Sequence, residues 1–310
     1  MKKFIAFFLV MVTAVSVSAC TITLRPVLSS GNSSSGSSKT PSYSGNQGKT
    51  NNQTKTVTVS NQIIYDDGTF TVTATDFVSN GTWGPGLKML IENNSDKSIM
   101  VMADDVSVNG YIVGNSFTAQ VAPGKKTYST MEMLEYDLSR AKITTIADIE
   151  FRLSFMDTDP YRIITETEPL SVKTSAASSY KYVYDDNKGD LLYEDENVKI
   201  LVGELAPYEG LGFNYPTLGL YYVNKGDKHL NVCPKDVSVN GFSIQAGGYT
   251  SLPAGKRLFG GIALRTDLLK ENGIDGVKDI HEMEFSICIS DWFSGEVYAE
   301  PEPFKLTFGK

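Results

Sequence analysis

The chain has 310 residues and a formal net charge of −8, from 28 Lys and Arg against 36 Asp and Glu. An acidic chain with no basic stripe argues against nucleic-acid binding and against direct docking on anionic lipid. It has only two histidines, neither of them in a zinc-enzyme pattern such as His-Glu-x-x-His, so a zinc enzyme is not expected either.

Residues 1–19 have the features of a secretion signal. Lys2 and Lys3 precede an apolar run over 4–17, which is short for a membrane-spanning helix. The run ends in Val17-Ser18-Ala19-Cys20, a segment that resembles the bacterial lipoprotein lipobox. That resemblance implies cleavage before Cys20, diacylation of its thiol and a lipid anchor at the membrane. The alternative is an ordinary signal-peptidase site in which Cys20 is incidental.

Residues 20–55 are expected to form a lipidated cysteine followed by a disordered linker. Residues 29–38 are nearly pure Ser and Gly, and the stretch to Thr56 is mostly Asn, Gln, Thr and Lys. Such a segment cannot bury enough apolar surface to offset its ordering entropy. A flexible chain of this length has a root-mean-square reach of roughly 30 Å. We expect it to act as a tether between the membrane and the folded part.

A seven-residue motif occurs twice in the folded part. Asp105–Tyr111 reads Asp-Val-Ser-Val-Asn-Gly-Tyr, and it returns 131 positions later (105 to 236) as Asp236–Phe242, with Phe in the last place. Each copy alternates apolar and polar residues and then reaches Asn-Gly. Asn-Gly favours a type I′ turn, whose twist suits two antiparallel strands. Each copy therefore predicts a strand, a tight turn and a second strand.

The repeat extends over about a hundred residues in the same order. Asn93 corresponds to Asn224, Gly124 to Gly255, and the strand motif at 149–151 to the one at 283–285. The period is too long for a solenoid and suits one whole domain per copy. We therefore predict two tandem homologous domains, at 56–174 and 180–310.

Both copies show many short alternating strands with turn signals about every ten residues. Each has one short helical signal, at 133–141 in the first copy and after Thr266, the expected N-cap, in the second, where Gly273 should end the helix. The predicted fold is all-β, with two tandem antiparallel β-sandwiches. The pattern resembles the immunoglobulin-like domains found in pairs on surface lipoproteins of low-GC Gram-positive bacteria. No activity is implied by that resemblance, and the Cys…Trp…Cys signature of antibody domains is missing.

No catalytic motif stands out in the sequence. Neither a Gly-x-Ser-x-Gly elbow nor a phosphate-binding Gly-rich loop is found, so we expect no enzyme and no cofactor. His229 and His281 are interpreted as surface histidines. The acidic stretch 185–190 lacks the glycine that a calcium loop needs at its sixth position, so a polar hairpin turn is expected there and no metal site.

Two cysteines remain besides Cys20. Cys233 and Cys288 both fall out of phase with the apolar residues of their strands, which predicts that they lie on the polar face. The first copy has Met102 and Ser154 at the equivalent places, so the fold cannot depend on a bond between them. Whether they form a disulfide stays open at this point.

Aromatic residues in loops are the candidate ligand contacts. The loop between the first two strands differs most between the copies, and such loops can carry binding residues because they carry no core. The predicted contacts are Trp83, Tyr208, Phe213 and Tyr215. The alternative is that these rings fold back onto the sandwich ends. Trp292-Phe293, at a strand end, is a further exposed aromatic pair.

These features predict a lipid-anchored protein outside the cytoplasm, at the cell surface, that acts as a non-catalytic binding, adhesion or spacer module. Its expected partners are the membrane, through the lipid on Cys20, and a surface protein or glycan. The alternative is a surface hydrolase or metal-dependent enzyme that uses acidic residues. A pocket with two carboxylates some 5–10 Å apart beside an aromatic ring would favour that alternative.

Overall fold

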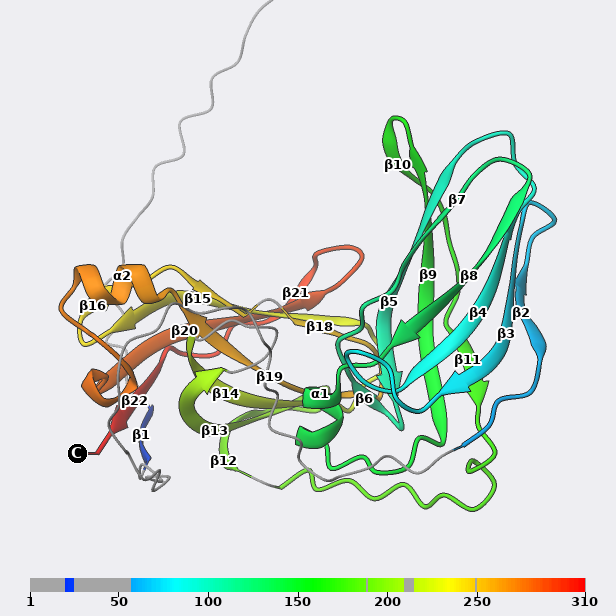
Figure 1. The fold of residues 1–310 in the computed structure, drawn as a ribbon. Helices are drawn as coiled ribbons and strands as arrows, with labels where there is room; N and C mark the ends of the chain where they lie inside the picture. The colour runs from blue at the N-terminus through cyan, green and yellow to red at the C-terminus, as the bar shows by residue number, and fades with distance from the viewer. Residues whose placement is uncertain (1–19, 25–56, 188, 209–214, 249, 310) are drawn as a thin grey trace, which may run out of the picture.

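A computed structural model describes residues 20–24, 57–187, 189–208, 215–248 and 250–309. It is all-β, as predicted, with two β-sandwiches set at an angle to each other (Figure 1). Among the described residues, no helix is both long enough and apolar enough to cross a membrane.

The first sandwich packs a four-stranded sheet against a larger one. The four-stranded sheet has the order β2 (Gln62–Asp66), β3 (Phe70–Val78), β4 (Gly86–Asn93), β8 (Lys125–Glu132). The facing sheet contains β5 (Ile99–Val108), β6 (Tyr111–Ile112), β7 (Thr118–Val121), β9 (Asp148–Thr158), β10 (Tyr161–Glu166) and β11 (Leu170–Lys173). Helix α1 (Glu135–Arg140) lies between β8 and β9 in the chain.

The second sandwich repeats this plan. One sheet contains β12 (Asp190–Glu194), β13 (Val198–Tyr208), β14 (Tyr215–Asn224), β17 (Ala246–Gly247) and β19 (Arg257–Leu264). The other contains β15 (Leu230–Val239), β16 (Phe242–Ser243), β18 (Thr250–Leu252), β20 (Glu282–Asp291), β21 (Val297–Ala299) and β22 (Phe304–Phe308). Strand β1 (Cys20–Leu24) pairs in parallel with β22, so the prediction of a disordered linker is wrong for the residues directly after Cys20. Helix α2 (Thr266–Glu271) and the 3₁₀ helix η2 (Val277–Asp279) precede β20.

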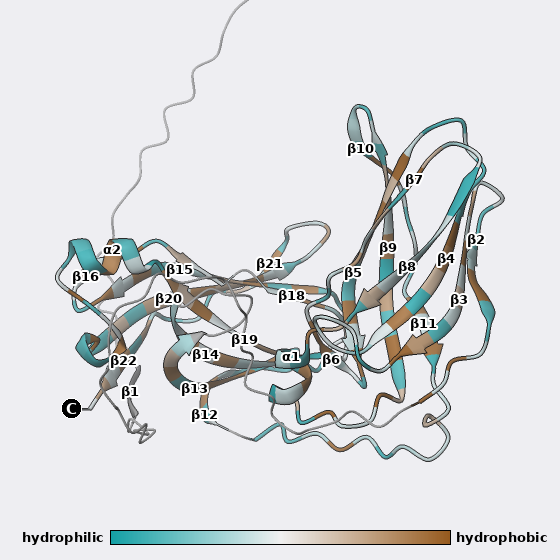
Figure 2. Ribbon diagram, viewed as in Figure 1, coloured by the Kyte–Doolittle hydropathy of each residue, from teal (hydrophilic) through white to brown (hydrophobic). Residues whose placement is uncertain are grey.

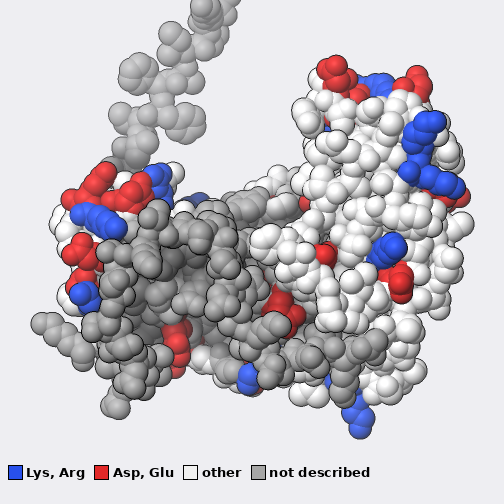
Figure 3. Space-filling model, viewed as in Figure 1, with Lys and Arg blue, Asp and Glu red and all other residues white. Residues whose placement is uncertain are grey.

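Each sandwich has its own apolar core between its sheets (Figure 2). The alternation of β9 buries Phe151 and Phe155, and that of β20 buries Phe285 and Ile289, each 1 % exposed or less. These are the faces that the period-2 pattern predicts. The charged residues on the face shown in Figure 3 are scattered, with Lys and Arg among Asp and Glu.

The repeated motif forms the hairpin that the sequence predicts. Asn109 and Gly110 have φ angles of 51° and 86°, and Asn240 and Gly241 have 49° and 82°. Positive φ at both central residues defines a type I′ turn. The Asn side chains also anchor the chain that enters β9 or β20: Asn109 Oδ1 accepts the backbone N–H of Ala147 at 2.8 Å, and Asn240 Oδ1 accepts that of His281 at 2.8 Å.

A second repeated asparagine has an equally structural role. The Nδ2 of Asn93 donates to the Lys97 carbonyl at 2.7 Å, and that of Asn224 donates to the Lys228 carbonyl at the same distance. Both side chains are 1 % exposed or less. Buried polar groups are normally hydrogen-bonded, so Asn93 fixes the turn at 93–97 and Asn224 fixes the equivalent turn at 224–228.

The two short helices lie close to the predicted places. Helix α1 begins two residues later than the predicted stretch, and α2 ends before Gly273, whose φ of +74° is that of a C′ glycine. The expected N-cap is wrong by one residue. Arg265 precedes the helix, and Thr266 is its first residue, with a buried hydroxyl that makes no hydrogen bond.

The two sandwiches are joined through strands as well as side chains. β6 pairs in parallel with β19, so one sheet of the first sandwich continues into the second. Tyr111 stacks on Phe259 with ring centroids 6.0 Å apart, and Phe259 packs on Tyr221 at 4.5 Å. This shared aromatic cluster holds the two sandwiches together.

The chain between the sandwiches packs against the first one. Tyr184 donates to the Asn109 carbonyl at 3.1 Å, and Tyr182 hydrogen-bonds Asp148. Asp186 accepts hydrogen bonds from Nε and Nη2 of Arg257 at 2.8 and 2.6 Å. Asp186 and Asn187 lie in a turn, as predicted for 185–190, and Asp186 in addition makes a bidentate ion pair with Arg257 at the junction.

Candidate functional site

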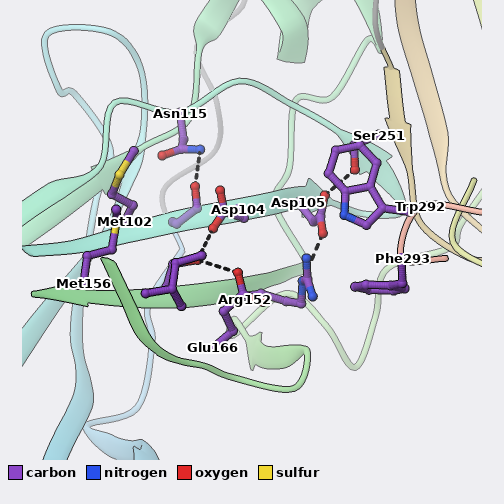
Figure 4. Close-up of a pocket in the computed structure, with 13 residues that line it drawn as sticks. Met102, Asp104, Asp105, Asn115, Arg152, Met156, Glu166, Ser251, Trp292 and Phe293 are labelled. Atoms are coloured by element: carbon purple, nitrogen blue, oxygen red, sulfur yellow. Dashed lines mark hydrogen bonds and ion pairs between the residues drawn. The ribbon is translucent and has the colours of Figure 1, made fainter. Parts of the chain in front are cut away.

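A cleft of about 550 Å³ lies at the corner where the two sandwiches meet. Strands β5, β9 and β10 of the first sandwich form one wall, while β18 and the turn after β20 form the other (Figure 4). Its lining residues are Met102, Ala103, Asp104, Asp105, Asn115, Arg152, Ser154, Met156, Ile163, Glu166, Ser251, Trp292 and Phe293. The cleft therefore exists only because both domains contribute to it.

Asp105 connects the two walls of the cleft. Its Oδ2 accepts a hydrogen bond from Arg152 Nε at 3.0 Å, and its Oδ1 accepts one from the Ser251 hydroxyl at 2.6 Å. Arg152 belongs to the first sandwich and Ser251 to the second. Charge-assisted hydrogen bonds of this kind are short and comparatively strong.

The backbone at Asp105 explains the direction of its side chain. Asp105 and its counterpart Asp236 have φ angles of 52° and 50°, at the points where the β5–β9 and β15–β20 registers shift. Such a β-bulge re-aims a side chain. The Asp105 carboxylate therefore crosses to the second sandwich.

His229 lies in the same cluster and is not a surface histidine. Its side chain is 11 % exposed, its Nε2 is 2.7 Å from the Ser251 hydroxyl oxygen, and its ring stacks on Trp292 at 5.1 Å. Burial lowers the pKa of His229 below its ordinary value; Arg152 acts in the same direction, while Asp105 and Asp291 oppose it. The prediction of surface exposure is wrong for His229 and right for His281.

The cluster of Ser251, His229 and Asp105 differs from a nucleophilic triad. In a triad the histidine takes the proton of the serine, and the carboxylate orients the histidine. Here the hydroxyl of Ser251 donates to Asp105, so a neutral His229 with its proton on Nε2 can donate to Ser251. The three residues form a chain of hydrogen bonds between the domains.

Two further carboxylates, those of Asp104 and Glu166, lie close together on the first sandwich. The hydroxyl oxygen of Ser154 is 2.5 Å from Asp104 Oδ2 and 3.4 Å from Glu166 Oε1. Ser154 itself is only 6 % exposed. Among the described residues, neither Asp104 nor Glu166 forms an ion pair with Lys, Arg or His. This part of the cleft therefore places two carboxylates close together without an ion-pair partner among the described residues.

Apolar side chains line the rest of the cleft. Phe293, in the turn after β20, is 67 % exposed, and its ring lies 5.3 Å from the guanidinium of Arg152. Ile163 and Met102 are 56 % and 37 % exposed on the facing wall. Large exposed apolar side chains can anchor the apolar part of a ligand, and the carboxylates beside them can contact a positive charge on the same ligand.

A metal centre is not indicated by this arrangement. Within the part of the chain that the structure describes, no group of three or more His, Cys, Asp or Glu side chains is placed to hold a metal ion.

The four residues predicted as ligand contacts do not line this cleft. Trp83 and Tyr215 are 43 % and 37 % exposed, in the loop before β4 and at the start of β14. Phe213 and the side chain of Tyr208 lie outside the described residues. Binding by these four residues stays a prediction.

Most of the cleft residues are not indicated by the sequence. Phe293 belongs to the aromatic pair noted above. The polar lining residues lie in strands of ordinary alternating pattern, and this pattern does not show that the second domain packs beside them: Asp104, Arg152, Ser154 and Glu166. The feature of the sequence that could have pointed to this junction is a difference between the two copies: His229 stands where the first copy has Ser98.

Comparison with known proteins gives little. No protein-family model matches the chain, and no curated protein does. Among solved structures, the YadV chaperone matches with a TM-score of 0.22 and 9 % identity, over 71 % of this chain and 90 % of its own. A protein of unknown function from Porphyromonas gingivalis W83 matches with a TM-score of 0.20 and 10 % identity, over 82 % and 99 %.

Proposed function

We propose that this protein is a lipid-anchored, extracytoplasmic binding module without catalytic activity, and that its partner binds in the cleft between the two sandwiches. The anchor follows from the lipobox-like segment at Cys20 and the Ser/Gly-rich tether after it. The observation that carries the binding role is the exposed ring of Phe293 opposite the carboxylates of Asp104 and Glu166.

The proposed partner is a protein segment that presents a basic side chain. A Lys or Arg placed between Asp104 and Glu166 supplies the positive charge that the described residues lack there. Phe293, Met102 and Ile163 then cover the apolar part of the segment. Aromatic anchors at the centre of such a contact commonly carry most of the binding energy.

A second candidate function has one observation in its favour. Because Asp104 and Glu166 contact the same hydroxyl oxygen, their carboxylate oxygens lie within about 6 Å of each other, beside an aromatic ring. Retaining glycosidases place two carboxyl groups about 5–5.5 Å apart. A surface glycan hydrolase is therefore the alternative, and release of sugar from a glycan substrate would support it.

Two arrays test the binding role: synthetic ten-residue peptides of varied Lys and Arg content, and glycans. The purified chain should bind basic peptides, and Phe293→Ala should weaken that binding about tenfold or more. Phe242→Ala is the matched control, because Phe242 is 46 % exposed on β16, at the end of the second sandwich far from the cleft. Binding that survives Phe293→Ala, or binding to glycans alone, contradicts the proposal.

The anchor is tested separately in a bacterial host. Cells that make the full chain should incorporate a palmitate analogue into it, and Cys20→Ala should abolish the label. A Cys20→Ala chain that still takes up the label contradicts the lipid-anchor part.

A further inference from the structure

Cys233 and Cys288 lie directly opposite each other on neighbouring antiparallel strands. In the β15–β20 ladder Cys233 is the register partner of Cys288, between the pairs Val232–Ile289 and Pro234–Ile287. Val232 and Ile289 point into the core. Because side chains alternate along a strand, both cysteines project from the outer face of the same sheet, as the sequence predicts.

The backbone spacing of such a pair suits a disulfide. Opposite residues of an antiparallel ladder have Cα atoms about 4.5–5.5 Å apart. A disulfide requires Cα atoms about 4.4–6.8 Å apart. The Cα separation of the two strands is therefore within the range that a disulfide allows. Both thiols are free in the structure.

The surroundings of the two thiols differ. Cys288 is 6 % exposed although it points outward, and the ion pair of Lys235 and Glu300 lies near its thiol. Cys233 is partly exposed, and its Sγ lies 3.6 Å from the Pro234 carbonyl oxygen. Cys233 is thus the thiol that an oxidant can reach first.

We propose that Cys233 and Cys288 form an intradomain disulfide when the folded chain meets a disulfide oxidant. The Cys233 thiol loses its proton to water and its thiolate attacks the oxidant, which releases one thiolate and leaves a mixed disulfide. Cys288 then loses its proton and attacks the Cys233 sulfur, which releases the second thiolate. Two thiols are oxidised to one disulfide, and the disulfide of the oxidant is reduced to two thiols.

The bond has a defined place in the fold. His229 lies just before β15, four residues from Cys233. Trp292 and Phe293 lie just after β20, four and five residues from Cys288. The Trp292 backbone N–H already donates to the His229 carbonyl at 2.9 Å. A disulfide between the strands therefore fixes the wall that the second sandwich contributes to the cleft. That the protein lies in an oxidising compartment, where the disulfide would form, rests on the proposed function. The test of the disulfide itself does not depend on that location.

Peptide mapping of the purified full chain tests the bond directly. The folded chain is treated with oxidised glutathione, denatured with a thiol-blocking reagent and cleaved after Lys and Arg without reduction. Peptides 229–235 and 279–305 each contain one of the two cysteines. We expect them to appear joined, two hydrogens lighter than their sum. Separate peptides, blocked or carrying glutathione, overturn the proposal, as does a link from either one to Cys20.

Thermal unfolding supplies a second readout that does not depend on a variant. The bond closes a loop of more than 50 residues, so oxidation should raise Tm of the wild-type chain on the order of 10 °C relative to the reduced chain. In Cys233→Ser, Tm should be the same with and without oxidant. An equal Tm for oxidised and reduced wild type overturns the proposal. A failure of lipid labelling at Cys20 would leave both results untouched.

Discussion

The hydroxyl of Ser251 donates a hydrogen bond of 2.6 Å to Oδ1 of Asp105, and these two residues belong to different sandwiches. Asp236 occupies the same bulge in the second copy, but there it is exposed. One residue of the repeat thus shapes a strand in both copies and joins the domains in only one. The duplication supplied the geometry, and the partner residues of the other domain gave it a second role.

The coupling between these two residues can be measured by a double-mutant cycle. Asp105→Asn and Ser251→Ala should each destabilise the chain, and their effects should be non-additive by about 1.5–3 kcal/mol, as for a hydrogen bond to a charged group. The measurement is the free energy of urea unfolding of the wild type, both single variants and the double variant. Strictly additive effects would mean that the contact contributes nothing to stability.

The pair of Arg257 and Asp186 should contribute measurably to the stability of the junction between the sandwiches. Arg257 is also held face-on over Tyr184, 3.5 Å from the ring centroid, and is largely buried. Truncating one partner of such a pair leaves the other charge unpaired, so Arg257→Ala should cost about 3 kcal/mol. Arg257→Lys should cost nearly as much, because an ammonium cannot form the two-point contact.

Calorimetry and urea unfolding check this prediction. We expect one transition for the wild type and a single transition at lower stability for Arg257→Ala, because one ion pair of the junction is lost while the β6–β19 pairing, the aromatic cluster and both cores remain. Arg265→Ala is the matched control: its ion pair with Asp267 is more than half exposed, so its loss should change the stability little. Equal effects of the two substitutions would show that the junction pair is not special.

His229 should make the stability depend on pH. Burial lowers its pKa in the folded chain, whereas in the unfolded chain the pKa is near 6.5. Above pH 6.5 the imidazole is neutral in both states and has no effect. As the pH falls from 6.5 toward the lower folded pKa, the unfolded chain binds a proton that the folded chain does not, so stability is lost.

The Tm measured between pH 5 and 8 tests this. In the wild type it should fall below pH 6.5, and in His229→Gln that fall should be smaller, while His281→Gln should behave like the wild type. Asp291 does not interfere in this range, because hydrogen bonds from Ser294 hold its pKa at about 2. A wild-type Tm that is flat from pH 8 to 5 would contradict the burial of His229.

The parts of the fold that follow from local pattern could be predicted from the sequence. The Asn-Gly turns, the buried faces of β9 and β20 and the glycine that ends α2 each depend on residues within a few positions of each other. The N-cap of α2 was missed because the hydroxyl of Thr266 is buried just inside the helix.

The candidate site could not be predicted in the same way. Asp104 and Glu166 meet only because β10 folds back on β9, and Asp105 meets Ser251 only because β6 pairs with β19. His229 looks like a surface residue when only its neighbours in the sequence are considered. Its burial comes from Trp292 and from the first sandwich, and no spacing in the sequence encodes that junction.

Methyl NMR of the methionines tests most directly whether the cleft is the binding site. Met102 and Met156 line the cleft, while Met89, Met131 and Met283 are fully buried in the two cores and serve as internal references. The chain, labelled with ¹³C at the methionine methyl groups, is titrated with the basic peptide that binds tightest on the array. The account predicts saturable shifts of the Met102 and Met156 signals, with the core signals unchanged, and no shifts in the double variant Asp104→Asn, Glu166→Gln. Peptide binding that leaves both cleft methyl signals in place would contradict it.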